Sequence, residues 1–90
     1  MRQGTVGIEA ALGCVISKLR SDLGISQEIL AFESGLDRSY ISQLENGKRQ
    51  AGIVTLFQRA KALKTTPADI IKSVQDLHYG SAKLTMDCVN

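Results

Sequence analysis

Apolar residues recur every three or four positions along most of the chain, the spacing that places them on one face of an α-helix. The first such run predicts a helix over residues 8–23, and its apolar positions are Ile8, Leu12, Val15, Ile16, Leu19 and Leu23. Gly24 follows at once, and glycine readily adopts the left-handed conformation in which many helices end. The folded part of the chain therefore begins with one amphipathic helix.

Two shorter helices are predicted after it. Ser26 is suited to cap a second helix, because its hydroxyl accepts a hydrogen bond from an unpaired backbone N–H. Gly35 ends that helix, Asp37 caps a third, and the third runs to about Asn46 before Gly47 stops it. The inward positions of the pair are Leu30, Ala31, Leu36, Ile41 and Leu44.

The same spacing predicts two further helices. A fourth covers residues 53–63, and its inward positions are Ile53, Leu56, Phe57, Ala60 and Leu63. Thr66 caps a fifth, since threonine suits the cap and Pro67 suits the first helical position. The apolar positions of the fifth are Ile70, Ile71, Val74 and Leu77. The expected fold is all-α, a compact five-helix domain over residues 8–78.

The two ends of the chain lie outside this pattern. Residues 1–7 lack an apolar run, so a flexible N-terminus is expected there and not a signal peptide. Residues 79–90 form a C-terminal tail in which Leu84, Met86 and Cys88 alternate with polar residues, a weak strand pattern. The tail is interpreted either as frayed or as a strand that pairs with a partner chain.

Composition narrows the class of protein. Ninety residues make one small domain with a modest core, and Cys14 and Cys88 have no Cys or His neighbours at metal-ligand spacing. Two reduced thiols in a cytoplasmic protein are favoured, with a disulfide as the open alternative. No apolar stretch approaches the ~18 residues of a membrane span, and no catalytic constellation accompanies the single histidine, His78. We expect no enzyme, metal, cofactor, membrane contact or small-molecule ligand.

The positive charge is concentrated in one segment. Residues 46–68 contain no acidic residue, whereas the whole chain has a net charge of only +2. The basic residues of this segment are Lys48, Arg49, Arg59, Lys61 and Lys64. It follows the third helix directly, where a phosphate backbone would lie if that helix bound DNA. A solvated charged face is the alternative, but the position of the segment favours double-stranded DNA as the partner.

The second and third helices meet the requirements of a helix-turn-helix, in which two helices cross steeply over a short turn. Ala31 is small where the helices approach each other, Gly35 allows the positive φ of the turn, and Leu36 fills the corner. Ile41 and Leu44 point from the third helix back into the domain. Such a motif presents one helix to the major groove of DNA.

Further residues over about 12–71 stand in the same order as in a known family. They are Leu12-Gly13, Ile16, Leu19-Arg20, Ile25-Ser26-Gln27-Glu28, Leu30-Ala31, Gly35-Leu36, Tyr40-Ile41-Ser42, Leu44-Glu45-Asn46-Gly47-Lys48-Arg49, Leu56 and Ala60-Lys61-Ala62-Leu63. The set resembles the lambda-repressor-like (Xre-type) helix-turn-helix family. The resemblance implies a five-helix domain whose third helix reads DNA. Arg59 departs from the family, which has an apolar residue there, and this suggests an exposed far side of the fourth helix.

The outward residues of the third helix are the predicted base readers. The resemblance assigns base contacts to Arg38, Ser39 and Gln43, and Ser42 flanks them. Arginine can donate two bonds to guanine and glutamine can pair with adenine, so Arg38 and Gln43 are expected to read bases directly, with both serines secondary. A surface salt bridge of Arg38 with Glu28 or Glu33 is the alternative. Contacts to the phosphate backbone are predicted for Gln27, Tyr40, Asn46, Lys48 and Arg49.

One domain of this size reads few base pairs, so a homodimer on half-sites about one helical turn, ~34 Å, apart is expected. The predicted dimer surface comprises Val74, Leu77, Tyr79, Leu84 and Met86, with Ile29 and Phe32 as a second exposed apolar pair. Alternatively, these residues complete the core of the monomer. The predicted function is a sequence-specific, repressor-like DNA-binding transcriptional regulator. The alternative is a protein-interaction module, or an antitoxin-type component, with the same fold.

Overall fold

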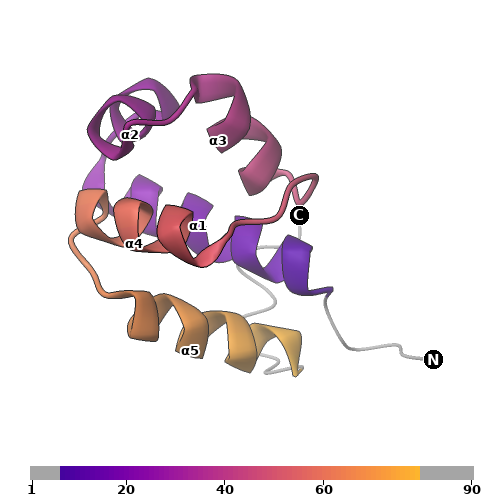
Figure 1. Cartoon of the computed structure of the whole chain (residues 1–90). Coiled ribbons are helices and arrows are strands. Elements are labelled where there is room, and N and C mark those ends of the chain that lie inside the picture. Colours follow the sequence, from indigo (N-terminus) through magenta and orange to yellow (C-terminus); the bar gives the residue numbers. More distant parts are fainter. Residues whose placement is uncertain (1–6, 80–90) are drawn as a thin grey trace.

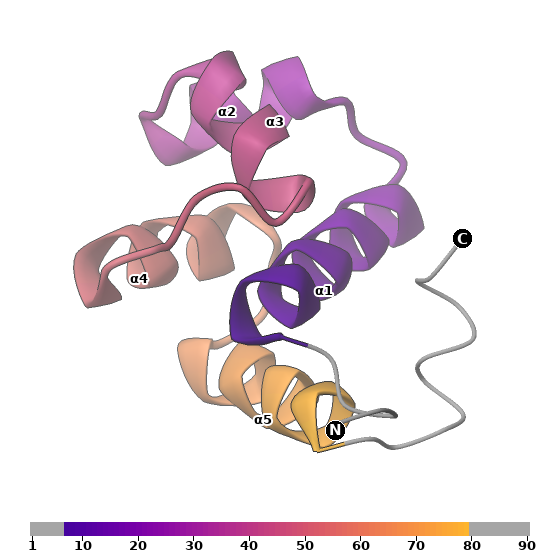
Figure 2. The same ribbon diagram turned by 90° about the vertical axis from the view of Figure 1, so that its right-hand side faces the viewer.

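Five helices occupy residues 7–79, the part of the chain that the computed structural model describes, and no strand lies within it. They are α1 (Ile8–Leu23), α2 (Gln27–Ser34), α3 (Arg38–Glu45), α4 (Ile53–Ala62) and α5 (Pro67–His78). Figure 1 shows α2 and α3 together at one end of the molecule, α5 at the opposite end, and α1 and α4 between them. The side view in Figure 2 shows the same order. The predicted all-α five-helix fold is confirmed.

The helix ends lie close to the predicted positions. Ser26 Oγ accepts a hydrogen bond from the backbone N–H of Ile29 at 3.1 Å, and Thr66 Oγ1 accepts one from Asp69 at 3.1 Å. Asp37 is the cap residue of α3, although its side chain makes no capping bond. Gly35 has the left-handed conformation expected at the turn between α2 and α3, with φ 71°. Local signals therefore define where each helix begins and ends.

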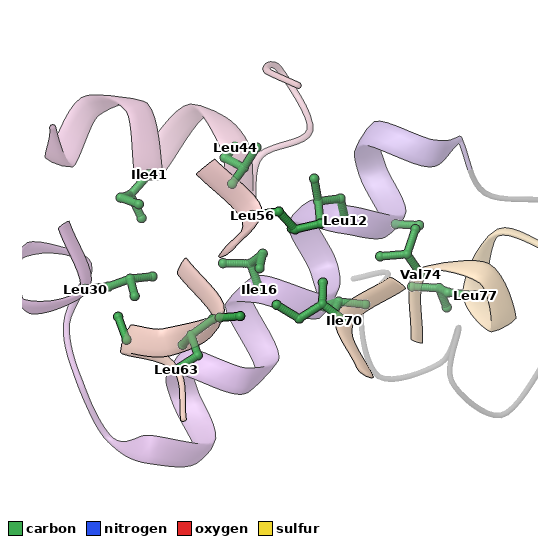
Figure 3. Packing of buried hydrophobic residues seen from close by; sticks show 14 of the residues in the cluster. Leu12, Ile16, Leu30, Ile41, Leu44, Leu56, Leu63, Ile70, Val74 and Leu77 are labelled. Atoms are coloured by element: carbon green, nitrogen blue, oxygen red, sulfur yellow. The ribbon is translucent and has the colours of Figure 1, made fainter. Parts of the chain in front are cut away.

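The core is aliphatic and centres on α1, which packs against α3 and α5, while α4 packs against α2 and α5. Figure 3 shows Ile16 of α1 within this cluster, with Leu30 and Ile41 to one side and Ile70 and Val74 to the other. The buried apolar residues are Ala11, Leu12, Val15, Ile16, Leu30, Ala31, Ile41, Leu44, Leu56, Ala60, Ala62, Leu63, Ile70, Val74 and Leu77. Burial of this shared surface accounts for most of the favourable free energy of folding.

Two residues of the predicted dimer surface belong to this core instead. Val74 and Leu77 are buried because α5 packs its apolar side against α1, so the monomer itself uses both side chains. Tyr79 is exposed at the end of α5. Leu84 and Met86 lie outside the described residues, as do residues 1–6 and the remainder of the tail.

The inward face of α4 differs from the one predicted. Ile53 and Phe57, expected to be buried, are 67% and 58% exposed, and Val54 beside them is 68% exposed. Arg59, expected on an exposed side, is 0% exposed. At about 100° per residue, Arg59 stands about 60° from Leu56 around the helix, whereas Phe57 stands about 100° from it. The face covered by α2 and α5 therefore includes the arginine and leaves three apolar side chains in solvent.

Cys14 lies half-buried on α1 against the core. Cys14 is disulfide-bonded, so the prediction of two reduced thiols is wrong and the alternative of a disulfide holds for this residue. Cys88 lies outside the described residues.

The end of α3 approaches α1 closely at Gly13. A Cβ atom placed on Gly13 would overlap the carbonyl oxygen of Leu44 and lie 2.6 Å from that of Glu45. Gly47 makes a similar contact, because a Cβ atom there would lie 3.2 Å from Cα of Ala10. Backbone therefore packs against backbone where α3 meets α1, and no larger side chain fits between the two helices.

We predict that Gly13→Ala destabilises the domain by about 2–3 kcal/mol, because the added methyl group must push the end of α3 away from α1. The expected fall in Tm is roughly 10–20 °C for a domain of this size. Thermal unfolding followed by circular dichroism measures it. Gly52→Ala is the matched control, since a Cβ atom on Gly52 meets no atom within 4 Å. Equal Tm values for the two variants would show that the contact at Gly13 does not constrain the fold.

Candidate nucleic-acid interface

A network around the Glu45 carboxylate fixes the C-terminal end of α3. Arg20 donates from Nε to Glu45 Oε2 at 2.6 Å and from Nη2 to Oε1 at 3.0 Å, a two-point ion pair that is largely buried. Gln27 Nε2 donates to the same Oε1 at 3.0 Å, and Arg20 Nη1 donates to the carbonyl of Ile25 at 2.9 Å. The Glu45 carboxylate thus joins α3 to α1 and α2, and Arg20 adds a bond to the turn between α1 and α2.

The electrostatics of this network favour the charged form of Arg20. Hydrogen bonds to the Glu45 carboxylate raise the pKa of Arg20 above its usual range, an effect that outweighs the lowering of its pKa by burial. Breaking a buried pair of this kind leaves one charge without compensation, which typically costs about 3–5 kcal/mol. The network therefore holds α3 in one position relative to α1 and α2.

The polar face of α3 points away from the core. Ile41 and Leu44 are fully buried on one side of the helix, while Arg38, Ser39 and Gln43 are exposed on the other. Ser42, the fourth predicted base reader, is half-buried. The four predicted readers therefore share one short helix at the end of the molecule farthest from α5 (Figures 1 and 2).

Arg38 makes no ion pair within residues 7–79, so neither Glu28 nor Glu33 holds it on the surface. Its guanidinium is exposed in the first turn of α3. The salt bridge considered as an alternative from the sequence is absent from the described part of the chain. Arg38 is accordingly available to a ligand of α3.

Tyr40 ties the basic loop to α3. Its hydroxyl donates to the carbonyl of Gln50 at 2.8 Å, and Cζ of Arg49 lies 4.9 Å from the centre of its ring. Gln50 Nε2 in turn donates to Glu9 Oε2 on α1 at 3.2 Å. These bonds fasten the loop between α3 and α4 to α3 and to α1. The loop exposes three predicted phosphate-binding residues next to the polar face of α3. These are Asn46, Lys48 and Arg49.

Two predicted phosphate contacts already have partners within the protein. The Gln27 amide donates to Glu45, and the Tyr40 hydroxyl donates to Gln50, so contacts of these groups with phosphate would compete with internal bonds. Both residues are half-buried. They contribute first to the placement of α2 and of the basic loop.

Sequence reasoning missed the roles of Glu45 and Gln50 in this network, and it missed the burial of Arg59 on α4. Nothing in the local pattern around Glu45 or Gln50 points to their partners, which lie 25 and 41 positions away at Arg20 and Glu9. Arg59 did carry a signal. It follows Leu56 by three positions and precedes Leu63 by four, the spacing of the buried face.

Residues 7–79 hold neither a candidate membrane span nor a candidate metal site. None of the five helices there is both long and apolar enough to cross a membrane. No group of three or more His, Cys, Asp or Glu side chains gathers in that part of the chain in a way that could hold a metal ion.

Comparison with known proteins identifies relatives of this geometry. The family model described as Helix-turn-helix matches residues 16–70. Control protein C.BamHI of Bacillus amyloliquefaciens is 37% identical over 68 residues, which make up 74% of this chain and 84% of that protein. The similarity thus extends over most of both chains.

Solved structures give the same result. The restriction-modification controller protein C.AhdI from Aeromonas hydrophila is 41% identical, with a TM-score of 0.66 over 68% of this chain and 92% of that chain. The controller protein C.Esp1396I, solved as a tetramer in complex with its natural 35 base-pair operator, is 30% identical, with a TM-score of 0.73 over 82% and 97% of the two chains. With a family model that covers more than half of the chain, the protein belongs to the lambda-repressor-like helix-turn-helix family of DNA-binding transcriptional regulators.

Proposed function

We propose that this regulator binds a two-fold DNA operator as a homodimer, with α3 of each protomer in the major groove. The observation that carries the proposal is the exposed polar face of α3, bordered by a loop whose basic residues Lys48 and Arg49 are held beside it. A positive loop next to a polar helix suits a duplex, because the phosphates border the groove into which the helix fits. The similarity to one control protein and two restriction-modification controller proteins favours a controller role over an antitoxin role.

Direct base readout is assigned to Arg38 and Gln43. Both are exposed on α3, and Arg38 has no competing ion pair within the described chain. Arginine donates two bonds to guanine O6 and N7, and glutamine pairs with adenine N6 and N7. Ser39 and Ser42 discriminate less, because a hydroxyl donates and accepts equally well. Sequence preference therefore rests mainly on two side chains.

Attraction to the phosphate backbone is assigned to the loop between α3 and α4. Lys48, Arg49 and Asn46 are exposed there, and no carboxylate in residues 46–68 opposes them. Phosphate contacts fix the position of the domain on the duplex without reading sequence. Gln27 and Tyr40 support this role from the ends of α2 and α3, through their bonds to Glu45 and Gln50.

The dimer surface is assigned to the start of α4. Ile53, Val54 and Phe57 form an exposed apolar patch, and the chain enters it directly from the basic loop. An operator with half-sites ~34 Å apart requires both α3 helices on one side of the dimer, a condition that pairing at this patch has to meet. The buried side chains of α5 offer no such surface. The patch thus replaces Val74 and Leu77 as the main dimer contact.

A selection of bound sites from a random pool of double-stranded DNA tests the proposal. We expect two inverted half-sites whose centres lie about one helical turn apart. Arg38→Ala should relax the preference at one position of each half-site, with a loss of about 1–3 kcal/mol of discrimination. Lys48→Ala should weaken all sequences alike and lower the slope of log K against log salt by about 0.9 for each phosphate that the variant no longer neutralises.

Two results would contradict these assignments. Recovery of no preferred sequence by the wild type would refute sequence-specific binding and support the protein-interaction alternative. Unchanged preference in Arg38→Ala, with an altered preference in Lys48→Ala, would reverse the roles of the helix and the loop.

We predict that Phe57→Lys converts the dimer into a monomer with little change in Tm, because the Phe57 side chain is mostly in solvent and a charge there opposes pairing. Multi-angle light scattering at micromolar concentration measures the mass, with and without the selected DNA. Phe32→Lys is the matched control, since Phe32 on α2 is 86% exposed and distant in sequence from the patch. A monomeric Phe32→Lys beside a dimeric Phe57→Lys would move the dimer surface to α2.

A further inference from the structure

Arg59 is the largest fully buried side chain in the described part of the protein. Its Nε, Nη1 and Nη2 atoms have no hydrogen-bond partner within residues 7–79. Burial lowers the pKa of Arg59, and Tyr40 and Glu45 oppose that lowering only in part, although a guanidinium remains protonated in proteins at any ordinary pH. A buried charge that lacks well-formed hydrogen bonds is unfavourable for folding. Stability alone therefore does not explain an arginine at this position.

The nearest favourable contact of Arg59 is with the recognition helix. Its Cζ lies 5.7 Å from the centre of the Tyr40 ring, within the range of a cation–π interaction. Arg49 approaches the same ring from the exposed loop, at 4.9 Å. Such contacts strengthen when the cation is withdrawn from water, as Arg59 is. Tyr40 thus lies between one cation on the surface and one in the interior.

Tyr40 is also the residue that fastens the basic loop. Its hydroxyl donates to the Gln50 carbonyl, and Gln50 donates to Glu9 of α1. A change in the position of the Tyr40 ring would therefore shift the loop that exposes Lys48 and Arg49. Arg59 lies near the same ring but is itself fully buried.

We propose that Arg59 is a positioning residue for DNA binding: it holds the Tyr40 ring, and through that ring the basic loop, in the geometry that meets the phosphate backbone. The proposal rests on the DNA-binding function proposed above. It assigns a role to a residue that contacts neither bases nor phosphates. The arginine is then retained for binding, at the expense of the stability that an apolar residue among Leu56, Ala60 and Leu63 would provide.

Arg59→Met tests this separation of binding from stability. Methionine keeps most of the length of the side chain and removes the unpartnered charge, so Tm should stay equal or rise. Affinity for the DNA site selected by the wild type should fall about tenfold, a loss typical of a desolvated cation–π contact. Amide hydrogen exchange of residues 47–51 in the free protein should become faster, while exchange in the five helices stays unchanged. Lys61→Met, which removes one exposed charge from the same helix, is the matched control and should leave the loop unaltered.

A double-mutant cycle tests the route through Tyr40. In a Tyr40→Ala background, Arg59→Met should change DNA affinity less than about twofold, because the ring that Arg59 positions is absent. Arg59→Lys keeps the charge without the planar guanidinium, and it should bind DNA with an affinity between those of the wild type and Arg59→Met. This second variant keeps the test decisive if Arg59→Met folds poorly.

Three results would overturn the proposal. The first is unchanged affinity of Arg59→Met at unchanged Tm. The second is an equal effect of Arg59→Met on affinity in the wild-type and Tyr40→Ala backgrounds. The third is a lower Tm with faster exchange in all five helices, which would give Arg59 a general structural role. If the wild type selects no DNA, the function proposed above fails, and the exchange of residues 47–51 alone decides whether Arg59 holds the loop.

Discussion

The close approach of α3 to α1 at Gly13 is the constraint on which the orientation of the recognition helix depends. The carbonyls of Leu44 and Glu45 pack against a residue without a side chain, and the same turn brings the Glu45 carboxylate to Arg20. Gly47 then lets the chain leave along Ala10. These contacts involve the C-terminal end of α3 and its buried side. The exposed side of α3 is therefore under little structural constraint. Residues there can change with the DNA sequence to be read without altering the fold.

Charge is divided between the interior and the surface in a way that suits a polyanionic ligand. The Glu45 carboxylate lies at the end of α3 nearest the basic loop. Arg20 neutralises its charge, and Gln27 donates a hydrogen bond to it. Its negative charge is thereby prevented from opposing Lys48 and Arg49, which remain exposed. An unpaired carboxylate at that point would reduce the attraction for phosphates over about a Debye length. The ion pair thus serves the interface as well as the fold.

Local features of the sequence predicted the helices. The buried face of α4 and several hydrogen-bond partners depend on contacts between distant residues, and these could not be predicted. Ser26, Gly35 and Thr66 define helix ends through bonds within a few positions, so their roles were readable from neighbours alone. The buried side of α4 depends on where α2 and α5 lie. The apolar spacing therefore predicted that Phe57 is buried, whereas in the packed domain Arg59 is buried and Phe57 is exposed. The exposure of Arg38, Ser39 and Gln43 on α3 was predictable, because these positions lie away from Ile41 and Leu44, which are buried. The internal partners of Tyr40 and Gln27 were not.

Tyr40 shows why the fold and the interface cannot be treated separately in so small a domain. A chain of ninety residues buries a modest fraction of its surface, so few side chains are far from both the core and the ligand. Tyr40 stands on α3, bonds to the loop through Gln50, and contacts Arg49 in solvent and Arg59 in the interior. A charge buried on α4 can therefore influence the loop proposed to bind the phosphate backbone, with only the Tyr40 ring between them. In this domain a single side chain, Tyr40, connects the core to the proposed interface.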